Sequence, residues 1–158
     1  MASSNPDTTG SGDDPHGFSL VQVSGHDPNF VAVCTLLAEL RPQLTVQTFA
    51  QLLVDAVALN LVYEAAILET EVAALVGWRL VTDSRLGRHL YVADLVVASP
   101  RRGLGLGRAV LAEVVARARE LNCTTVVLDS GVENTSAHHF YEALGFAQTA
   151  LQFELALN

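Results

Sequence analysis

The sequence predicts a single α/β domain built on a mixed β-sheet, and three observations lead to this fold class. The chain has 158 residues, of which 50% are hydrophobic, and this is enough to bury one core without disulfides or metals. Two apolar runs separated by a polar dipeptide near the middle of the chain predict an antiparallel hairpin. A later strand, helix and strand in succession predict a parallel pair joined by a right-handed crossover.

The composition excludes several classes of function. All 9 basic residues are arginines, and they stand against 17 acidic residues, which leaves a formal net charge of −8. This balance argues against nucleic-acid and membrane partners, because both attract surfaces rich in Lys and Arg. A Schiff-base enzyme or a Walker-type phosphate loop would need a lysine, and the chain has none. Cys34 and Cys123 are too few for a disulfide framework, so a cytoplasmic location is expected.

The chain divides into a short tail and one domain. Residues 1–16 contain hardly any apolar side chains, and we expect a disordered, acidic tail there. Residues 17–158 are expected to form the domain. Its first element is a short strand, which the alternation over residues 18–23 predicts.

Two helices are predicted to follow this strand. The pair Asp27-Pro28 is typical of a helix start, and Pro42 ends that helix soon after residue 40. Residues 45–60 form the second helix, because their apolar side chains fall on one stripe: Phe49, Leu52, Leu53, Ala56 and Leu59.

Three strands come next. Residues 63–69 and 72–81 are the two apolar runs of the predicted hairpin. Residues 90–97 form the next strand, and Pro100 stops it because proline cannot donate a hydrogen bond to the ladder.

A long helix follows the third of these strands. From Gly105 or Gly107 to about residue 122 the apolar side chains recur with the helical period. Glu113 and Arg117 are spaced to form an ion pair on the outer side of this helix.

The chain closes with a strand, a helix and a strand. Residues 124–129 have an all-apolar centre, which is typical of a strand covered on both faces. Residues 136–144 form a short helix, and Gly145 is placed to end it in the left-handed conformation. The alternation over residues 148–157 predicts the last strand.

The segment between the strand 90–97 and the long helix carries the chemistry. It contains three alternating glycines, flanked by Arg101, Arg102 and Arg108. Such glycines allow positive φ and a close approach of the backbone, so that a row of N–H groups and a helix N-terminus can bind a phosphate or pyrophosphate. A nicotinamide cofactor is disfavoured, because its glycine spacing would need a glycine where Arg108 or Val110 stands.

The run Arg102-Gly103-Leu104-Gly105-Leu106-Gly107 resembles the Arg/Gln-x-x-Gly-x-Gly/Ala signature of the GNAT family of N-acetyltransferases. Asp94-Leu95-Val96-Val97 is similar to the strand before the family loop. Asn134 and the segment 137–146, which ends in Leu-Gly-Phe, are similar to the family's closing helix. The resemblance covers about residues 63–157. It implies the GNAT-type acyl-CoA N-acyltransferase fold, with helices on both faces of a twisted sheet and parallel strands that splay at their carboxyl ends.

The resemblance also implies where acetyl-CoA binds. Backbone groups of Leu95, Val96 and Val97 would hold the pantetheine arm and the thioester carbonyl. Asn134 matches a family residue that contacts coenzyme A, although an asparagine here can equally cap the following helix. The pyrophosphate would lie on the loop, with contacts from Arg102, Gly103, Leu104, Gly105, Leu106, Gly107 and Arg108.

Tyr141 is the candidate general acid. A phenol with a pKa near 10 can protonate a departing thiolate, whose thiol has a pKa near 8.5, if the two come within hydrogen-bond reach. The alternative is a core position, because Tyr141 belongs to an apolar helical stripe with Ala137, Phe140 and Leu144.

The general base is left open. Several family members have a glutamate immediately before the position of Asp94, but this chain has Ala93 there. Asp94 and Asp129 are the catalytic carboxylates we expect, and Glu133 is a further candidate. No metal is expected, because the cysteines and histidines lack the spacing of a zinc site.

The acidity of the chain favours a cationic acceptor, because a negative field raises the local concentration of cations. We therefore expect an N-acetyltransferase that acts on a small primary amine. Acetylation of protein amino termini or lysines is the alternative within this class, and a non-catalytic acyl-CoA sensor is the alternative outside it. A homodimer is left open.

Overall fold

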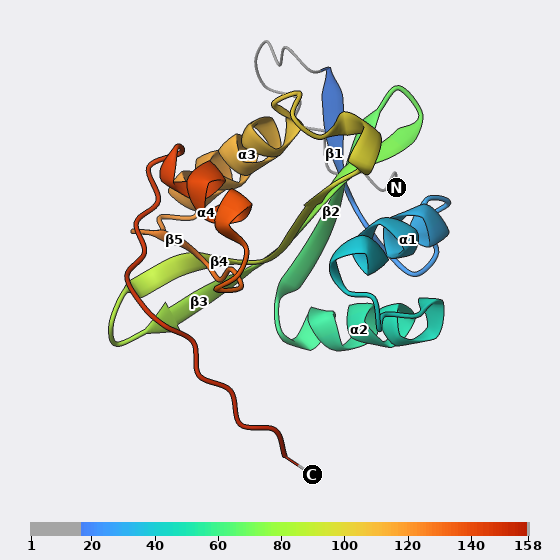
Figure 1. The fold of residues 1–158 in the computed structure, drawn as a ribbon. Coiled ribbons are helices and arrows are strands. Elements are labelled where there is room, and N and C mark those ends of the chain that lie inside the picture. Colours follow the sequence, from blue (N-terminus) through green and yellow to red (C-terminus); the bar gives the residue numbers. More distant parts are fainter. Residues whose placement is uncertain (1–16, 158) are drawn as a thin grey trace, which may run out of the picture.

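The computed structural model describes residues 17–157, which form one five-stranded sheet with helices packed against it (Figure 1). The predicted tail over residues 1–16 lies outside the described residues. The elements follow in the order β1 (Phe18–Gln22), α1 (Phe30–Leu40), α2 (Val46–Ala58), β2 (Leu61–Leu68), β3 (Glu71–Asp83), β4 (Gly87–Val97), the 3₁₀ turn η1 (Ser99–Arg101), α3 (Leu106–Glu120), β5 (Val126–Leu128) and α4 (Thr135–Glu142).

The sheet is mixed, as predicted. Strands β1 to β4 pair with their sequence neighbours in antiparallel fashion, and β5 is parallel to β4. The predicted hairpin is formed by β2 and β3, and Glu69 takes a φ of 60° in its turn. The parallel ladder is short, running from Leu90 opposite Val126 to Val92 opposite Leu128.

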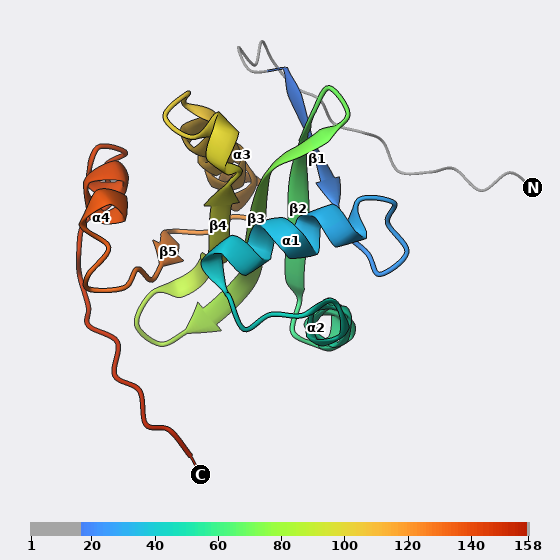
Figure 2. The same cartoon turned by 45° about the vertical axis from the view of Figure 1, so that its right-hand side comes forward.

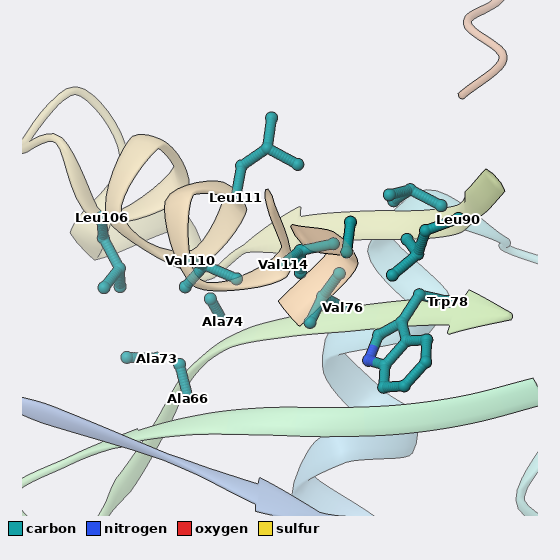
Figure 3. Close-up of a cluster of buried hydrophobic side chains, with 12 residues drawn as sticks. Ala66, Ala73, Ala74, Val76, Trp78, Leu90, Leu106, Val110, Leu111 and Val114 are labelled. Atoms are coloured by element: carbon teal, nitrogen blue, oxygen red, sulfur yellow. The ribbon is translucent and has the colours of Figure 1, made fainter. Parts of the chain in front are cut away.

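Helices cover both faces of the sheet, which Figures 1 and 2 show from two directions. Helices α3 and α4 pack on one face, where Val110 and Val114 of α3 meet Val76 and Trp78 of β3 (Figure 3). Helices α1 and α2 pack on the other face around Leu37, Phe49 and Leu75. We call these the α3 face and the α1 face of the sheet.

The helix starts follow local chemistry. Thr45 caps α2 in a capping box, in which its Oγ1 accepts from the Thr48 amide at 3.1 Å and the Thr45 amide donates to Thr48 Oγ1 at 2.9 Å. Helix α1 begins at Phe30, two residues later than Pro28, because Asp27 Oδ1 accepts a hydrogen bond from the Asn29 amide and holds a turn there. Gly145 takes a φ of 88° just after α4, as predicted.

Two predictions were wrong. Residues 148–157 form no strand, because the alternating pattern needs a neighbouring strand to pair with and the segment lies away from the sheet. Glu113 and Arg117 do not pair. Instead, Arg117 Nη1 donates to the buried Glu64 at 2.7 Å, and that carboxylate also accepts from Trp78 Nε1 at 2.7 Å. A buried carboxylate needs partners, and this requirement outweighs a solvent-screened ion pair on the helix surface.

No helix within residues 17–157 is both long enough and apolar enough to cross a membrane.

Candidate active site

The loop that joins β4 to α3 has the backbone that its glycines predict. Gly103 and Gly105 take φ values of 75° and 88°, and Gly105 is the N-cap of α3. A Cβ atom at Gly103 would meet nothing within 4 Å. Glycine is therefore favoured at this position by its positive φ, and not by a lack of space for a side chain. No side chain of the described residues caps α3. The first amides of the helix are therefore free to bind an anion.

Gly107 lies where three elements meet. A Cβ atom at this position would lie 3.3 Å from Cγ2 of Val97, at the end of β4, and 3.6 Å from Cζ of Phe140 in α4. The first turn of α3 thus packs closely on the last residue of β4 and on α4. This contact places the free amides of α3 beside the carboxyl end of β4.

The three arginines of the loop have different environments. Arg102 donates to the carbonyl of Val97 at 2.8 Å and to Glu39 of α1 at 2.6 Å, so it ties the loop to the α1 face. Arg101 lies 3.7 Å from Glu71. Arg108 is exposed and forms no ion pair within residues 17–157. Among the three, Arg108 is the one whose charge no acidic side chain within residues 17–157 offsets.

The free edge of β4 begins at Val92. The ladder with β5 ends there because β5 itself ends at Leu128, whereas β4 continues to Val97. The side chains of this part of β4 are used for packing. Val96 is buried on the α1 face, and Leu95 and Val97 pack on the α3 face. At this edge, these three residues can offer only their backbone N–H and C=O groups to a ligand.

A β-bulge at Ala93 decides where Asp94 points. Gly77 pairs with Asp94 and Trp78 pairs with Val92, so Ala93 is an extra residue in β4. Val92 and Leu95 both pack on the α3 face, which shows that the alternation is interrupted between them. Asp94 is thereby turned to the α1 face, where its polar partners lie.

Asp94 is 9% exposed and is held by two residues that sequence reasoning missed. The Tyr63 hydroxyl donates to its Oδ2 at 2.8 Å. Arg41, the residue after α1, places Nη2 3.0 Å from its Oδ1, but Oδ1 accepts no hydrogen bond within the described residues. Asp94 is thus a buried carboxylate whose Oδ2 accepts a hydrogen bond from Tyr63 and whose Oδ1 forms an ion pair with Arg41.

Tyr63 depends on a glycine for its position. A Cβ atom at Gly77 would lie 2.6 Å from Cε1 of Tyr63, so the ring occupies the space that a side chain at position 77 would need. Burial, followed by the charge of Asp94, raises the pKa of Tyr63 above its usual range. An isolated glycine inside a predicted strand is a sign of such a close approach, and it is the one signal that could have pointed to Tyr63.

Asp129 lies just after β5 and has one clear partner. Its Oδ2 accepts from the hydroxyl of Tyr91 at 2.6 Å, and Arg79 stacks 5.2 Å over the Tyr91 ring. Burial and the hydrogen bond to Asp129 raise the pKa of Tyr91 to about 12. Asp129 and Glu133 are both exposed, in contrast to Asp94.

Tyr141 has a ring packed in the core and a hydroxyl without a hydrogen-bond partner in the described residues. Its ring lies edge-on to Phe140 and Phe146, with centroids 5.2 and 5.8 Å away, and packs on the α3 face. Its hydroxyl forms no hydrogen bond within residues 17–157. Burial raises the pKa of this hydroxyl, so it keeps its proton at neutral pH. Tyr141 and Asp94 lie on opposite faces of the sheet, with the free edge of β4 between those faces.

Asn134 caps α4. Its Oδ1 accepts from the Ala137 amide at 3.2 Å and from the Ser136 hydroxyl at 3.1 Å. The side chain is exposed, so the cap does not prevent a further contact with a ligand. Residues 17–157 contain no group of three or more His, Cys, Asp or Glu residues that could hold a metal ion.

Comparisons with known proteins show the family and the fold. A family model described as the acetyltransferase (GNAT) family matches residues 28–146. An uncharacterized N-acetyltransferase of Bacillus subtilis, YhdJ, is 34% identical over 113 residues, which cover 70% of this chain and 80% of the relative. A probable glucosamine 6-phosphate N-acetyltransferase of Oryza sativa is 29% identical over 145 residues, which cover 85% and 84% of the two chains.

The fold also recurs among solved structures. A putative acetyltransferase from Agrobacterium tumefaciens superposes with a TM-score of 0.74 at 25% identity, over 88% of this chain and 99% of that one. Two further curated relatives are matched over only 14% and 38% of their own length.

Proposed function

Because the chain belongs to the GNAT family of acetyltransferases, we propose that it transfers the acetyl group of acetyl-CoA to a primary amine of a small molecule. The observation that carries the proposal is the convergence of three features at the carboxyl end of β4. These are the uncapped first turn of α3, the free backbone edge beyond Val92, and the buried carboxylate of Asp94 with an oxygen that accepts no hydrogen bond within the described residues.

The loop fits the pyrophosphate of coenzyme A. Gly103 and Gly105 take the left-handed conformations that bring consecutive amides together, and the absence of a Cβ at Gly107 keeps the helix start close to β4. Arg108 adds a cation that no acidic side chain within residues 17–157 neutralises. Arg102 supports the site by fixing the loop to Glu39. When bound there, acetyl-CoA supplies the acetyl group as a thioester that an amine can attack.

Asp94 is the group we assign as the base. An alkyl amine has a pKa near that of Lys, about 10.4, and arrives as an ammonium ion. Oδ1 of Asp94 can accept a proton from that ion, directly or through a water molecule, and so leave the nitrogen lone pair free to form the new C–N bond. Arg41 and Tyr63 hold the carboxylate in one orientation while it does so.

Tyr141 is the group we assign as the acid. Its hydroxyl is protonated at neutral pH and forms no hydrogen bond within the described residues. It can donate that proton to the sulfur atom as the C–S bond breaks, so that a thiol leaves rather than a thiolate.

The proposal of a small amine as the acceptor is supported by the negative charge of the described residues and by the name of one relative. Residues 17–157 contain all nine arginines, and only three of the chain's 17 acidic residues lie outside them, so the described body is acidic. The rice relative is named for an amino sugar, which is a small primary amine. The cytoplasmic location stays a prediction.

Calorimetry with acetyl-CoA, followed by thiol release with a panel of amines, tests the proposal. Arg108→Glu should weaken acetyl-CoA binding by roughly tenfold or more, because it replaces the cation beside the proposed phosphate site with an anion. Arg85→Glu makes the same charge change in the exposed β3–β4 turn and should leave binding unchanged. Equal effects of the two variants would contradict the assigned loop.

The base is tested in the same assay. Asp94→Asn should lower kcat/KM by about 10²-fold or more, whereas Asp129→Asn should have a much smaller effect. The reverse order would transfer the role of base to Asp129. Binding of acetyl-CoA without thiol release for any amine would favour the sensor, and a preference for peptides would favour a protein acceptor.

A further inference from the structure

Arg41 is a half-exposed cation beside the carboxylate that we assign as the base. Its Nη2 lies 3.0 Å from Oδ1 of Asp94, yet its side chain is 49% exposed, whereas the side chain of Asp94 is 9% exposed. The side chain of Arg41 forms no other ion pair and no hydrogen bond within residues 17–157. Because a guanidinium has five N–H donors, most of those of Arg41 are free to bind a ligand that reaches Asp94.

Asp94 has the complementary feature. Its Oδ1 is buried and accepts no hydrogen bond within residues 17–157, although Arg41 lies close enough to form an ion pair with it. A buried carboxylate oxygen without a donor is costly, and a donor on a ligand removes that cost. The pair of Asp94 and Arg41 therefore offers an oxygen for a cation and free N–H groups for an anion, side by side.

The backbone around Arg41 is held in place. The amide of Arg41 donates to the carbonyl of Leu37 at 2.9 Å, and its carbonyl accepts from the amide of Leu44 at 2.9 Å. Two residues earlier, Glu39 accepts a hydrogen bond from Arg102 of the glycine loop at 2.6 Å. These contacts fix the C-terminal end of α1 over the sheet near β4 (Figure 2), so Arg41 reaches Asp94 from a fixed backbone.

The short distance between the two groups limits the ligand that can use both. A ligand that places an ammonium ion at Oδ1 of Asp94 and an anion on the free donors of Arg41 must carry these groups close together. In an α-amino acid the nitrogen and the carboxylate carbon are about 2.5 Å apart, as ordinary N–Cα and Cα–C bonds require. An amine whose anionic group is several carbons away fits this spacing less well.

The balance of charge during the reaction favours the same ligand. Once Asp94 has taken a proton from the ammonium ion, the carboxyl group is neutral and no longer balances the charge of Arg41. A carboxylate on the acceptor would then be the partner of the guanidinium, whereas an acceptor without an anion would leave the guanidinium unpaired at this step.

We propose that Arg41 binds the carboxylate of the acceptor, and that the acceptor is an α-amino acid whose amine lies against Asp94. The inference rests on the proposed acetyl transfer and narrows its small primary amine to one chemical class. It concerns contact within the site, whereas the negative field of the body acts on the approach of the ammonium group. Selectivity between acceptors therefore measures the contact, and salt dependence measures the field.

Matched acceptors test the class. Each free L-amino acid of a panel is compared with its α-carboxamide, which keeps the amine and the side chain but lacks the anion. We expect kcat/KM for the best amino acid to exceed that for its amide by about 10²-fold or more. A neighbouring amide lowers the pKa of the amine toward about 8, which makes deprotonation easier and works against this preference. Equal values, or a preference for the amide or for a phosphorylated amino sugar, would overturn the proposal.

Arg41→Gln tests whether this side chain causes the preference. The ratio of kcat/KM between acid and amide should fall to within about threefold of one, and Arg41→Lys, which keeps the charge, should restore part of it. An arginine that only orients Asp94 would lower the rates of both acceptors alike, and an unchanged ratio would contradict the proposal. Arg119→Gln makes the same change at an exposed position of α3 and should alter neither rate.

Binding measurements separate recognition from turnover. Calorimetric titration of the amino acid into the full chain with coenzyme A should show binding at least about tenfold tighter than that of its amide, and Arg41→Gln should abolish the difference. Equal binding of acid and amide would refute the role of Arg41 alone. Failure of thiol release with every amine would instead refute the proposed acetyl transfer, and the binding preference would still decide the class of ligand.

Discussion

Tyr141 has a ring that the core holds in place and a hydroxyl that nothing within residues 17–157 engages. A residue present only for packing could lose this hydroxyl without consequence. Tyr141→Phe keeps the contacts with Phe140 and Phe146 and removes only the proton donor. We expect kcat to fall by about 10²-fold, with little change in acetyl-CoA affinity, because the donor acts when the sulfur departs. Steady-state rates and calorimetry measure the two quantities, and an unchanged kcat would assign Tyr141 to the core alone.

The hydroxyl of Tyr91 makes stability sensitive to alkaline pH. Its pKa is raised to about 12 in the folded chain, against about 10 in an unfolded one. Above pH 10 the hydroxyl of Tyr91 loses its proton in the unfolded chain before it does so in the folded one. The contribution of this hydroxyl to stability is therefore complete below about pH 10 and disappears as the pH rises toward 12.

Tyr91→Phe isolates this contribution. The variant should be less stable than the parent at pH 8, because the bond to Asp129 is lost, and the difference should shrink between pH 10 and 12. Urea denaturation midpoints across this range measure it. A difference that stays constant with pH would show that Tyr91 titrates alike in both states.

At the scale of elements, the bulge in β4 and the glycine opposite it position the site together. Gly77→Ala would place a methyl carbon 2.6 Å from the Tyr63 ring, and the ring must move away from Asp94 to admit it. We expect a loss of about 1–3 kcal/mol in the free energy of unfolding, the usual range for an overpacked core, together with reduced activity. Urea denaturation and thiol release measure both.

Gly25→Ala is the control for this substitution, because a Cβ atom there would meet nothing within 4 Å. Its stability should stay within about 0.5 kcal/mol of the parent. If Gly77→Ala were equally mild, the contact between Tyr63 and Gly77 would not hold the ring in place.

Elements with local causes could be predicted from the sequence. The hairpin, the glycine loop and the left-handed Gly145 after α4 each depend on residues close together in the chain, so their patterns were sufficient for the prediction. The partners of Asp94 could not be predicted in this way. Tyr63 is 31 residues away, and only the bulge at Ala93 turns Asp94 toward it. The prediction of a strand over residues 148–157 was wrong for a related reason. Alternation shows that a segment can pair in a sheet, but it does not show which edge the segment would pair with.

At the scale of the whole molecule, charge is distributed unevenly. The arginines that form ion pairs with acidic side chains are spread over the body, and Arg108, beside the loop proposed for the pyrophosphate, has no ion-pair partner within residues 17–157. Acids outnumber arginines in residues 17–157, so the field around the body attracts cations. An amine acceptor that carries several positive charges should therefore be steered to the site more strongly than one that carries a single charge.

Salt dependence measures this steering. Raising the ionic strength from 0.01 to 0.1 M shortens the screening length from about 30 to about 10 Å. We expect kcat/KM for a polyamine to fall several-fold over this range, and kcat/KM for a singly charged amino sugar to fall less, because the attraction grows with the charge of the acceptor. A hydroxylated amine assayed above its pKa is neutral and serves as the uncharged reference. Its kcat/KM should change little with ionic strength. Equal slopes for all three acceptors would mean that the acidity of the body does not select the substrate, and the choice of acceptor would then rest on contacts within the site.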